Sequence, residues 1–187
     1  MLEIGGYLED TYAEDSDLSI RLLTKGYDIV FCPEMIAVTE VPDDIMSLIG
    51  QRYRWSRGVT QVIIKHSYWL FHPRKNARNF FIMLYLVLES IIIPLINFTF
   101  ILITLEQALY YKNSNMLGPF YISLTLLDAF LTLYSVVTEK QNFMLLLLSV
   151  VNRITYGLFL EVIRFFSFMD EILGIPMKWG KLIRKGL

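Results

Sequence analysis

Cysteine and histidine are scarce in this chain of 187 residues, which contains one cysteine, Cys32, and two histidines, His66 and His72. A single cysteine excludes an intrachain disulfide and a metal site built from thiolates. Unpaired cysteines are usually buried, so we expect Cys32 to lie buried in a strand. Neither histidine is close in sequence to an acid that could complete a metal site, and we expect both to be interface residues. The N-terminus has no basic segment followed by an apolar core, so we do not expect residues 1–12 to be a signal peptide.

Polar residues are also under-represented. Hydrophobic residues make up 55% of the chain and the mean hydropathy is +0.47, which is too apolar for a soluble domain of this size. The net charge of −1 is unevenly distributed: residues 1–50 hold eleven acidic and two basic residues, whereas residues 51–78 hold seven basic residues and no acid. A basic segment beside apolar sequence attracts anionic lipid headgroups and is typical of a cytoplasmic flank. The composition therefore predicts a protein in contact with a lipid bilayer.

The first 42 residues have the pattern of the end of an α/β domain. Apolar residues at helical spacing predict a helix from Ser16 that stops at Gly26. Two short β-rich runs follow, at residues 27–32 and 35–39, and predict two strands. Because one helix and two strands cannot bury a stable core, we expect further sequence upstream to complete this domain.

A second helix is expected to begin at Asp43-Asp44, which supply an N-cap, and to run to about residue 67. Its apolar residues alternate with Arg52, Arg57 and Lys65, so it is amphipathic and is predicted to lie at the membrane surface.

Three apolar segments follow. The first, residues 80–105, would extend about 39 Å as a helix, enough to cross a hydrocarbon core of roughly 30 Å. With a cytoplasmic N-terminal part, three spans would place the C-terminal tail outside the cell. The basic residues of this tail would instead favour the cytoplasmic side. We favour three spans because the earlier loops usually decide the orientation. We therefore expect a multi-pass cell-membrane protein with a cytoplasmic N-terminal part. Its predicted parts are the end of an α/β domain (1–42), an interfacial helix with a basic flank (43–78), transmembrane helices (79–105, 117–137 and 143–166) and a basic amphipathic tail (167–187).

An acidic cluster, Glu14, Asp15 and Asp17, stands where a loop enters the first helix. Acids at this place commonly cap a helix and complement its dipole, and that explanation suffices for the cluster alone. The alternative is that one carboxylate is a general base. Such a group contributes about 10² to 10⁴ in rate when it accepts the proton of an attacking hydroxyl.

Gln51, Arg54 and Trp55 form a more specific pattern, because spacings of three and four place them on one face of a helix. Arg54 offers a planar fork of donors suited to a diphosphate, and Trp55 offers an apolar plate on which a sugar ring can stack. A basic amphipathic helix with a tryptophan anchor is the simpler alternative.

Together these residues resemble a family. Glu14-Asp15 is similar to a Thr-Glu-Asp motif in which Ala13 replaces threonine, and Gln51, Arg54 and Trp55 match Gln-x-x-Arg-Trp. Both motifs are typical of the processive, membrane-embedded family 2 glycosyltransferases, namely the cellulose, hyaluronan and poly-N-acetylglucosamine synthases. The resemblance covers residues 4–61, and the tail is weakly similar to the last of these branches.

This resemblance implies a hexosyltransferase that moves a sugar from a nucleotide-sugar donor to a growing polysaccharide with inversion, coupled to export. Asp15 would be the base that deprotonates the acceptor, Gln51 and Arg54 would hold the diphosphate, and Trp55 would floor the acceptor subsite beside Glu14. The family implies a divalent metal, Mg²⁺ or Mn²⁺, whose main ligands precede this region and are absent from the chain. We therefore expect the C-terminal part of a synthase, with an upstream-encoded donor-binding half as a partner, and no nucleic-acid partner.

Ionisable residues also occur within or near the predicted spans, where they are costly unless they are paired or hydrated. Asp128 and Arg153 fall near the middle of two segments, and we expect them to pair between neighbouring helices. The functional alternative is a polar lining that guides a polysaccharide. Two other functions stay open: a catalytically inactive membrane subunit or remnant of a synthase, and a small transporter that uses the charges. The transporter ranks last because it has no use for the Gln51, Arg54 and Trp55 face.

Overall fold

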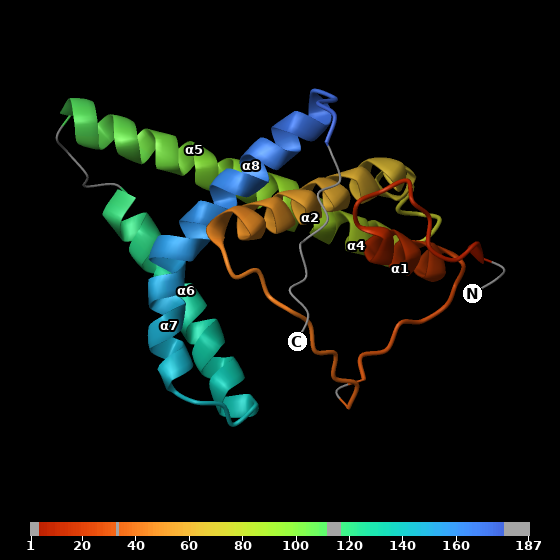
Figure 1. Ribbon diagram of the computed structural model, residues 1–187, viewed down its shortest axis with the longest axis horizontal. Helices are drawn as coiled ribbons and strands as arrows, with labels where there is room; N and C mark the ends of the chain where they lie inside the picture. Colours follow the sequence, from red (N-terminus) through yellow and green to blue (C-terminus); the bar gives the residue numbers. More distant parts are fainter. Residues whose placement is uncertain (1–3, 33, 112–116, 178–187) are drawn as a thin grey trace. The chain divides into compact units, whose positions relative to one another are not determined.

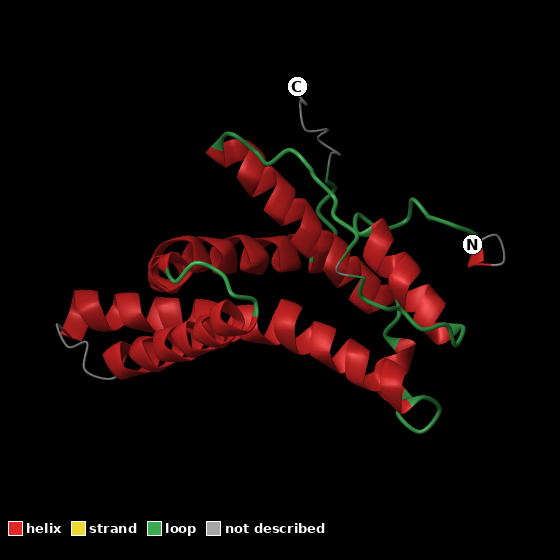
Figure 2. Ribbon diagram, turned by 90° about the horizontal axis from the view of Figure 1, so that it is seen from below, coloured by secondary structure: helices red, strands yellow, loops and turns green. Residues whose placement is uncertain are grey.

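The computed structural model describes residues 4–32, 34–111 and 117–177, and the chain divides into two compact units. The first unit comprises Met1–Ile93 and Ile163–Leu187, and the second comprises Pro94–Val162. Throughout the described ranges the regular structure is helical, with no β-strand (Figure 2). Ten residues of the predicted basic tail, 178–187, lie outside the described part.

The first unit is built from four α-helices, a π-helical turn and most of a fifth α-helix (Figure 1). In chain order these are α1 (Glu14–Thr24), α2 (Ile45–Lys65), α3 (Tyr68–Phe71), α4 (Ala77–Val87), η2 (Leu88–Ile92) and α8 (Leu158–Ile172). The predicted N-cap of α2 is confirmed, because the Asp44 carboxylate accepts a hydrogen bond from the backbone N–H of Ser47 at 2.8 Å. Helix α1 gives way to Gly26, whose φ of 91° few other residues adopt.

The core of this unit lies where α1, α2 and α4 meet. Its buried residues are Ala13, Ile20, Val62, Ile63 and Met83. The last two turns of α2 therefore bury their apolar face against the neighbouring helices, while Ile45 and Met46 at its start are 70% and 74% exposed. A location of α2 at the membrane surface stays a prediction.

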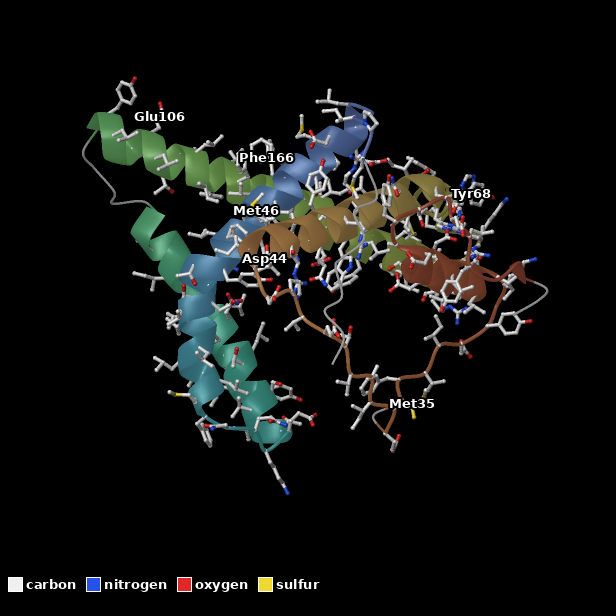
Figure 3. The ribbon with its side chains drawn as sticks, in the orientation of Figure 1. Met35, Asp44, Met46, Tyr68, Glu106 and Phe166 are labelled. Atoms are coloured by element: carbon white, nitrogen blue, oxygen red, sulfur yellow. The ribbon has the colours of Figure 1, made fainter. Side chains whose placement is uncertain are left out.

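The segment between α1 and α2 differs from the sequence prediction. Residues 27–32 and 35–39 were expected to form two strands, yet neither joins a ladder, and Figure 3 shows Met35 on a long loop between the two helices. Val30, Phe31 and Val38 are between 84% and 95% exposed. The strand prediction is wrong for the described residues because an extended segment becomes a strand only when its backbone pairs with another. Cys32 is likewise exposed rather than buried.

Long apolar helices were predicted from the hydrophobic runs. One described helix is long and apolar enough to cross a membrane, and it runs over 30 residues from Ala77 to Glu106 through α4, η2 and α5 (Ile93–Glu106). Two helices, Met144–Asn152 and Thr155–Ile172, pass the same test only together and are bent by 41°. A shorter apolar stretch, Ile122–Thr138, lies within α6 (Leu117–Thr138). The described helices thus offer one span, or up to two, and the three-span topology stays a prediction.

The second unit contains most of α5, a π-helical turn η3 (Gln107–Tyr111), α6, α7 (Met144–Asn152) and a further π-helical turn η4 (Arg153–Gly157). Helices α6 and α7 pack side by side (Figure 1). Arg153, at the start of η4, places Nη1 3.3 Å from Oδ2 of Asp128 on α6. The predicted pairing of these two charges is confirmed.

Candidate active site

The two sequence motifs meet at one cavity in the first unit. This cavity has a volume of about 870 Å³ and is lined by Tyr7, Leu8, Glu9, Thr11, Tyr12, Ala13, Glu14, Asp15, Ser16, Arg54, Trp55 and Val59. The structure therefore brings together four of the five predicted site residues: Glu14, Asp15, Arg54 and Trp55. The fifth, Gln51, lies one helical turn before Trp55 on α2 and is not among the lining residues.

A close approach of two backbones explains why the motifs meet. Gly58 of α2 lies against the start of α1, where a Cβ placed on it would stand 2.6 Å from the Ala13 nitrogen and 2.8 Å from the Ala13 Cβ. Arg54 and Trp55 lie four and three residues before Gly58, so they share its face of the helix. The contact at Gly58 thus brings that face to the first turn of α1, which carries Glu14 and Asp15.

The two acids occupy the first turn of α1. The Asp15 side chain is exposed and accepts a hydrogen bond from the Ser16 backbone N–H at 2.7 Å, and Glu14 is half-buried. Asp15 and Ser16 also line a second, mainly apolar cavity of about 540 Å³ between α1 and α4. The Asp15 carboxylate is therefore accessible from the cavity it shares with Trp55, as a base must be.

The part of the cavity lining that α2 provides consists of an arginine, an aromatic ring and Val59. Trp55 is 46% exposed, and the guanidinium of Arg52 stacks on its indole ring with 4.7 Å between the Cζ atom and the ring centroid. Such stacking holds the ring plane in place. Arg54, which lines the cavity beside Trp55, brings a positive charge to the cavity that Glu14 and Asp15 also line.

A third wall was missed by the sequence reasoning. It is formed by Tyr7, Leu8, Glu9, Thr11 and Tyr12, which follow a turn at Gly5 and Gly6 with φ values of 81° and 66°. The Tyr12 backbone N–H donates to the Gln61 side chain at 2.9 Å, and the Tyr12 hydroxyl donates to the Met177 carbonyl at 3.1 Å. The paired glycines followed by an aromatic residue were the available signal, because positive φ values at consecutive positions redirect a chain.

Asp17, the third acid of the cluster, has a different role from Asp15. Its side chain is fully buried and bonded to three groups: Arg21 Nε at 2.8 Å, Lys65 Nζ at 2.9 Å and His66 Nε2 at 2.7 Å. Burial favours the protonated acid, but the hydrogen bonds from Lys65, His66 and Arg21 outweigh it and lower the pKa of Asp17. The interface role expected for His66 is therefore wrong, since this side chain is 12% exposed and lies against an acid distant in sequence.

The end of α8 docks against α2 close to the cavity. Arg57 of α2, 4% exposed, donates to the Glu171 carboxylate at 2.7 Å and to the Ile175 carbonyl at 2.8 Å, and the Tyr53 hydroxyl donates to Asp170. Burial lowers the pKa of Arg57, but the bond to Glu171 more than offsets this and the net shift is upward. Burial together with the Asp170 carboxylate raises the pKa of Tyr53. These bonds hold one face of α2, and Arg54 and Trp55 lie on another face of the same helix.

The donor set does not fit a metal ion. In the part of the chain that the structure describes, no group of three or more His, Cys, Asp or Glu side chains is arranged to hold one. Asp15 and Asp17 match an Asp-x-Asp spacing, but the Asp17 oxygens are already bonded to Arg21, Lys65 and His66. No chemical step is therefore assigned to a metal held by these residues.

Comparison with known proteins shows the family of this chain. Three similar proteins of Arabidopsis thaliana are named probable glucomannan 4-beta-mannosyltransferases 15, 10 and 11, with 24%, 24% and 23% identity. Each comparison covers 79% of this chain but only 27% to 33% of the relative, so the chain spans about a third or less of their length. No solved structure gave a significant match. The model of the family described as "Glycosyl transferase family group 2" matches residues 1–160, which is most of the chain and includes both cavity motifs. This chain therefore belongs to glycosyl transferase family group 2.

Proposed function

We propose that this chain provides the base and the acceptor site of a membrane glycosyltransferase that extends a polysaccharide from a nucleotide-sugar donor. The observation that carries the proposal is the cavity shared by the two motifs, with Glu14 and Asp15 on one wall and Arg54 and Trp55 on another. A helix-capping role for the acids, or a membrane-anchoring role for the basic helix, would not require the two groups to share a cavity.

In this proposal the reaction is an inverting displacement. The Asp15 carboxylate accepts the proton of the acceptor hydroxyl, and the hydroxyl oxygen attacks the anomeric carbon of the donor. The new carbon–oxygen bond forms as the bond to the diphosphate breaks on the opposite side of the sugar. The nucleoside diphosphate leaves with that electron pair, and Arg54 compensates its negative charge with Gln51 as a second, amide contact. Trp55 holds the acceptor sugar by stacking, and Glu14 accepts hydrogen bonds from its hydroxyl groups.

The donor nucleotide and its divalent metal, Mg²⁺ or Mn²⁺, are assigned to sequence outside these residues, as a GT-A type donor-binding half. The curated relatives are about three to four times longer than the matched region, which supports such a half in trans or in a longer chain. Because those relatives are named as mannosyltransferases, a hexosyl donor is proposed, and mannose is the first sugar to test.

A location at the cell membrane, with the cavity on the cytoplasmic side, completes the proposal. The helix Ala77–Glu106 is apolar enough to cross the bilayer, and the basic residues Arg74, Lys75 and Arg78 at its start favour the cytoplasmic side. Nucleotide sugars would reach the cavity from that side, and the product could be passed outward along the apolar helices.

The experiment is a transfer assay on the whole chain in lipid vesicles, with and without the polypeptide encoded directly upstream. Mannose, glucose and N-acetylglucosamine nucleotides are supplied with Mg²⁺ or Mn²⁺, and released nucleoside diphosphate and polymer are both measured. We expect release and polymer together from one donor. If hydrogen exchange shows that the protein is folded and yet no donor or partner gives transfer, the result would instead favour a catalytically inactive subunit.

A further inference from the structure

The loop at residues 4–12 contributes Tyr7, Leu8, Glu9, Thr11 and Tyr12 to the cavity lining, yet its residues 7–10 are exposed. Tyr7 is 62% exposed and Leu8 is 36% exposed. A Cβ placed on Gly5 or on Gly6 would have no atom within 4 Å, so the turn itself lies open. Two glycines with positive φ also have more conformational freedom to lose on ordering than other residues. Burial of apolar surface therefore does not explain the position of residues 7–10, whereas Thr11 after them is buried.

Ionic hydrogen bonds hold the loop instead, and they come from two cations. The Arg21 guanidinium donates to the Ile4 carbonyl at 2.5 Å and to the Gly6 carbonyl at 2.6 Å. Lys65 donates from Nζ to both carboxylate oxygens of Asp10, at 2.7 and 2.9 Å. Arg21 therefore holds the start of the loop and Lys65 holds Asp10 near its end, beside the bonds of Tyr12 to Gln61 and Met177.

Both cations are in turn held by one buried acid. Asp17 binds Arg21 through Oδ2 and Lys65 through Oδ1, and His66 contacts Oδ1 as well. The Asp17 side chain has no exposed surface, whereas Arg21 and Lys65 are 14% and 27% exposed. Without the Asp17 charge, these two long side chains would gain hydration by turning to solvent and would release the loop.

We infer that Asp17 is a positioning residue for the cavity: through Arg21 and Lys65 it holds residues 4–12 at the cavity that Arg54 and Trp55 also line. Asp17 itself does not line the cavity, so it acts only through these cations. The role of Asp17 in holding the loop does not depend on the reaction. Only its expected effect on transfer rests on the proposed function.

The test is hydrogen exchange, followed by mass spectrometry of peptides, on the whole chain in lipid nanodiscs. Asp17→Asn keeps the size of the side chain and removes its charge. We expect exchange in residues 4–12 to rise about tenfold to hundredfold, which corresponds to the loss of one charge-assisted hydrogen bond, while α2 and α4 keep their protection. Asp28→Asn is the matched control, because it removes the same charge from an 81% exposed carboxylate paired with Arg78 at 2.6 Å and should leave the loop unchanged.

Unchanged exchange in residues 4–12 of Asp17→Asn would overturn the inference. If this variant loses protection throughout the chain, Arg21→Lys decides instead, because one ammonium group can keep the contact with Asp17 but cannot donate to the Ile4 and Gly6 carbonyls together. In Arg21→Lys, faster exchange confined to residues 4–12 would support the inference, and unchanged exchange in these residues would refute it. The transfer rate of the same variants, measured in the vesicle assay above, should fall as hydrogen exchange in the loop rises. If the wild-type chain shows no transfer, the proposed function fails while the exchange result still decides the role of Asp17.

Discussion

The approach of α2 to α1 at Gly58 decides whether the two motifs can share a cavity, so we expect Gly58→Ala to disturb both stability and the site. The added Cβ would lie 2.6 Å from the Ala13 nitrogen, 2.7 Å from the Tyr12 carbonyl carbon and 2.8 Å from the Ala13 Cβ. Two of these three atoms belong to the backbone, so no side-chain rotation relieves the clash. Overpacking of this kind costs about 1–3 kcal/mol.

Helix propensity acts in the opposite direction, because alanine is favoured over glycine within a helix by about 1 kcal/mol. Gly50 provides the control: it lies in the same helix, and a Cβ on it would meet no atom within 4 Å. The free energy of unfolding of Gly50→Ala should therefore rise by the gain in helix propensity alone. Since that gain is common to both variants, the free energy of unfolding should be lower for Gly58→Ala than for Gly50→Ala by about 1–3 kcal/mol.

The assay is equilibrium unfolding of the whole chain in detergent micelles by urea, followed by tryptophan fluorescence. The quantity compared is the difference in midpoint between the two alanine variants at equal slope. Equal midpoints would refute the reasoning, because they would mean that α1 and α2 do not approach each other at Gly58. Loss of transfer in Gly58→Ala but not in Gly50→Ala would further tie this contact to the cavity.

Two further predictions concern charge, and a third concerns the stacking ring of Trp55. Because the folded-state pKa of Asp17 lies below its ordinary value of about 4, its contribution to stability should be complete above that pH and lost as the pH falls further. The gap in unfolding midpoint between wild type and Asp17→Asn should therefore narrow as the pH falls from 6 towards 3, and a constant gap would contradict the assignment. A double-mutant cycle with Asp128→Asn and Arg153→Gln should give a coupling of about 0.6–1.7 kcal/mol in lipid, and no coupling would mean that the pair at 3.3 Å is not maintained there. Trp55→Phe should retain more transfer activity than Trp55→Ala, because a ring is still present, and equal losses in the two variants would argue against stacking.

Local rules predicted the helices well because their causes are local. The Asp44 cap, the stop at Gly26 and the spacing of Gln51, Arg54 and Trp55 each depend on residues within a few positions of one another. The Asp128 and Arg153 pair was also predictable, because two opposite charges in apolar segments have few other partners.

The features that the sequence did not predict depend on distant partners. Residues 27–32 and 35–39 carry the side chains of strands but have no backbone to pair with in the described chain. His66 and Asp17 are 49 positions apart, and nothing near either residue indicates their contact at 2.7 Å. The loop at residues 4–12 was missed as part of the cavity because its bonds to Arg21, Gln61 and Lys65 join residues far apart in sequence.

The most direct measurement of the central claim, that the two motifs form one acceptor site with Asp15 as its base, is the transfer rate of Asp15→Asn beside Asp28→Asn. The Asp15 variant should lose about 10² to 10⁴ in rate, because an amide cannot accept the acceptor proton, and Asp28→Asn should keep the wild-type rate. Both variants should show wild-type hydrogen exchange in α1 and α2, so that the loss is chemical rather than structural. Transfer by Asp15→Asn at the wild-type rate would contradict the account.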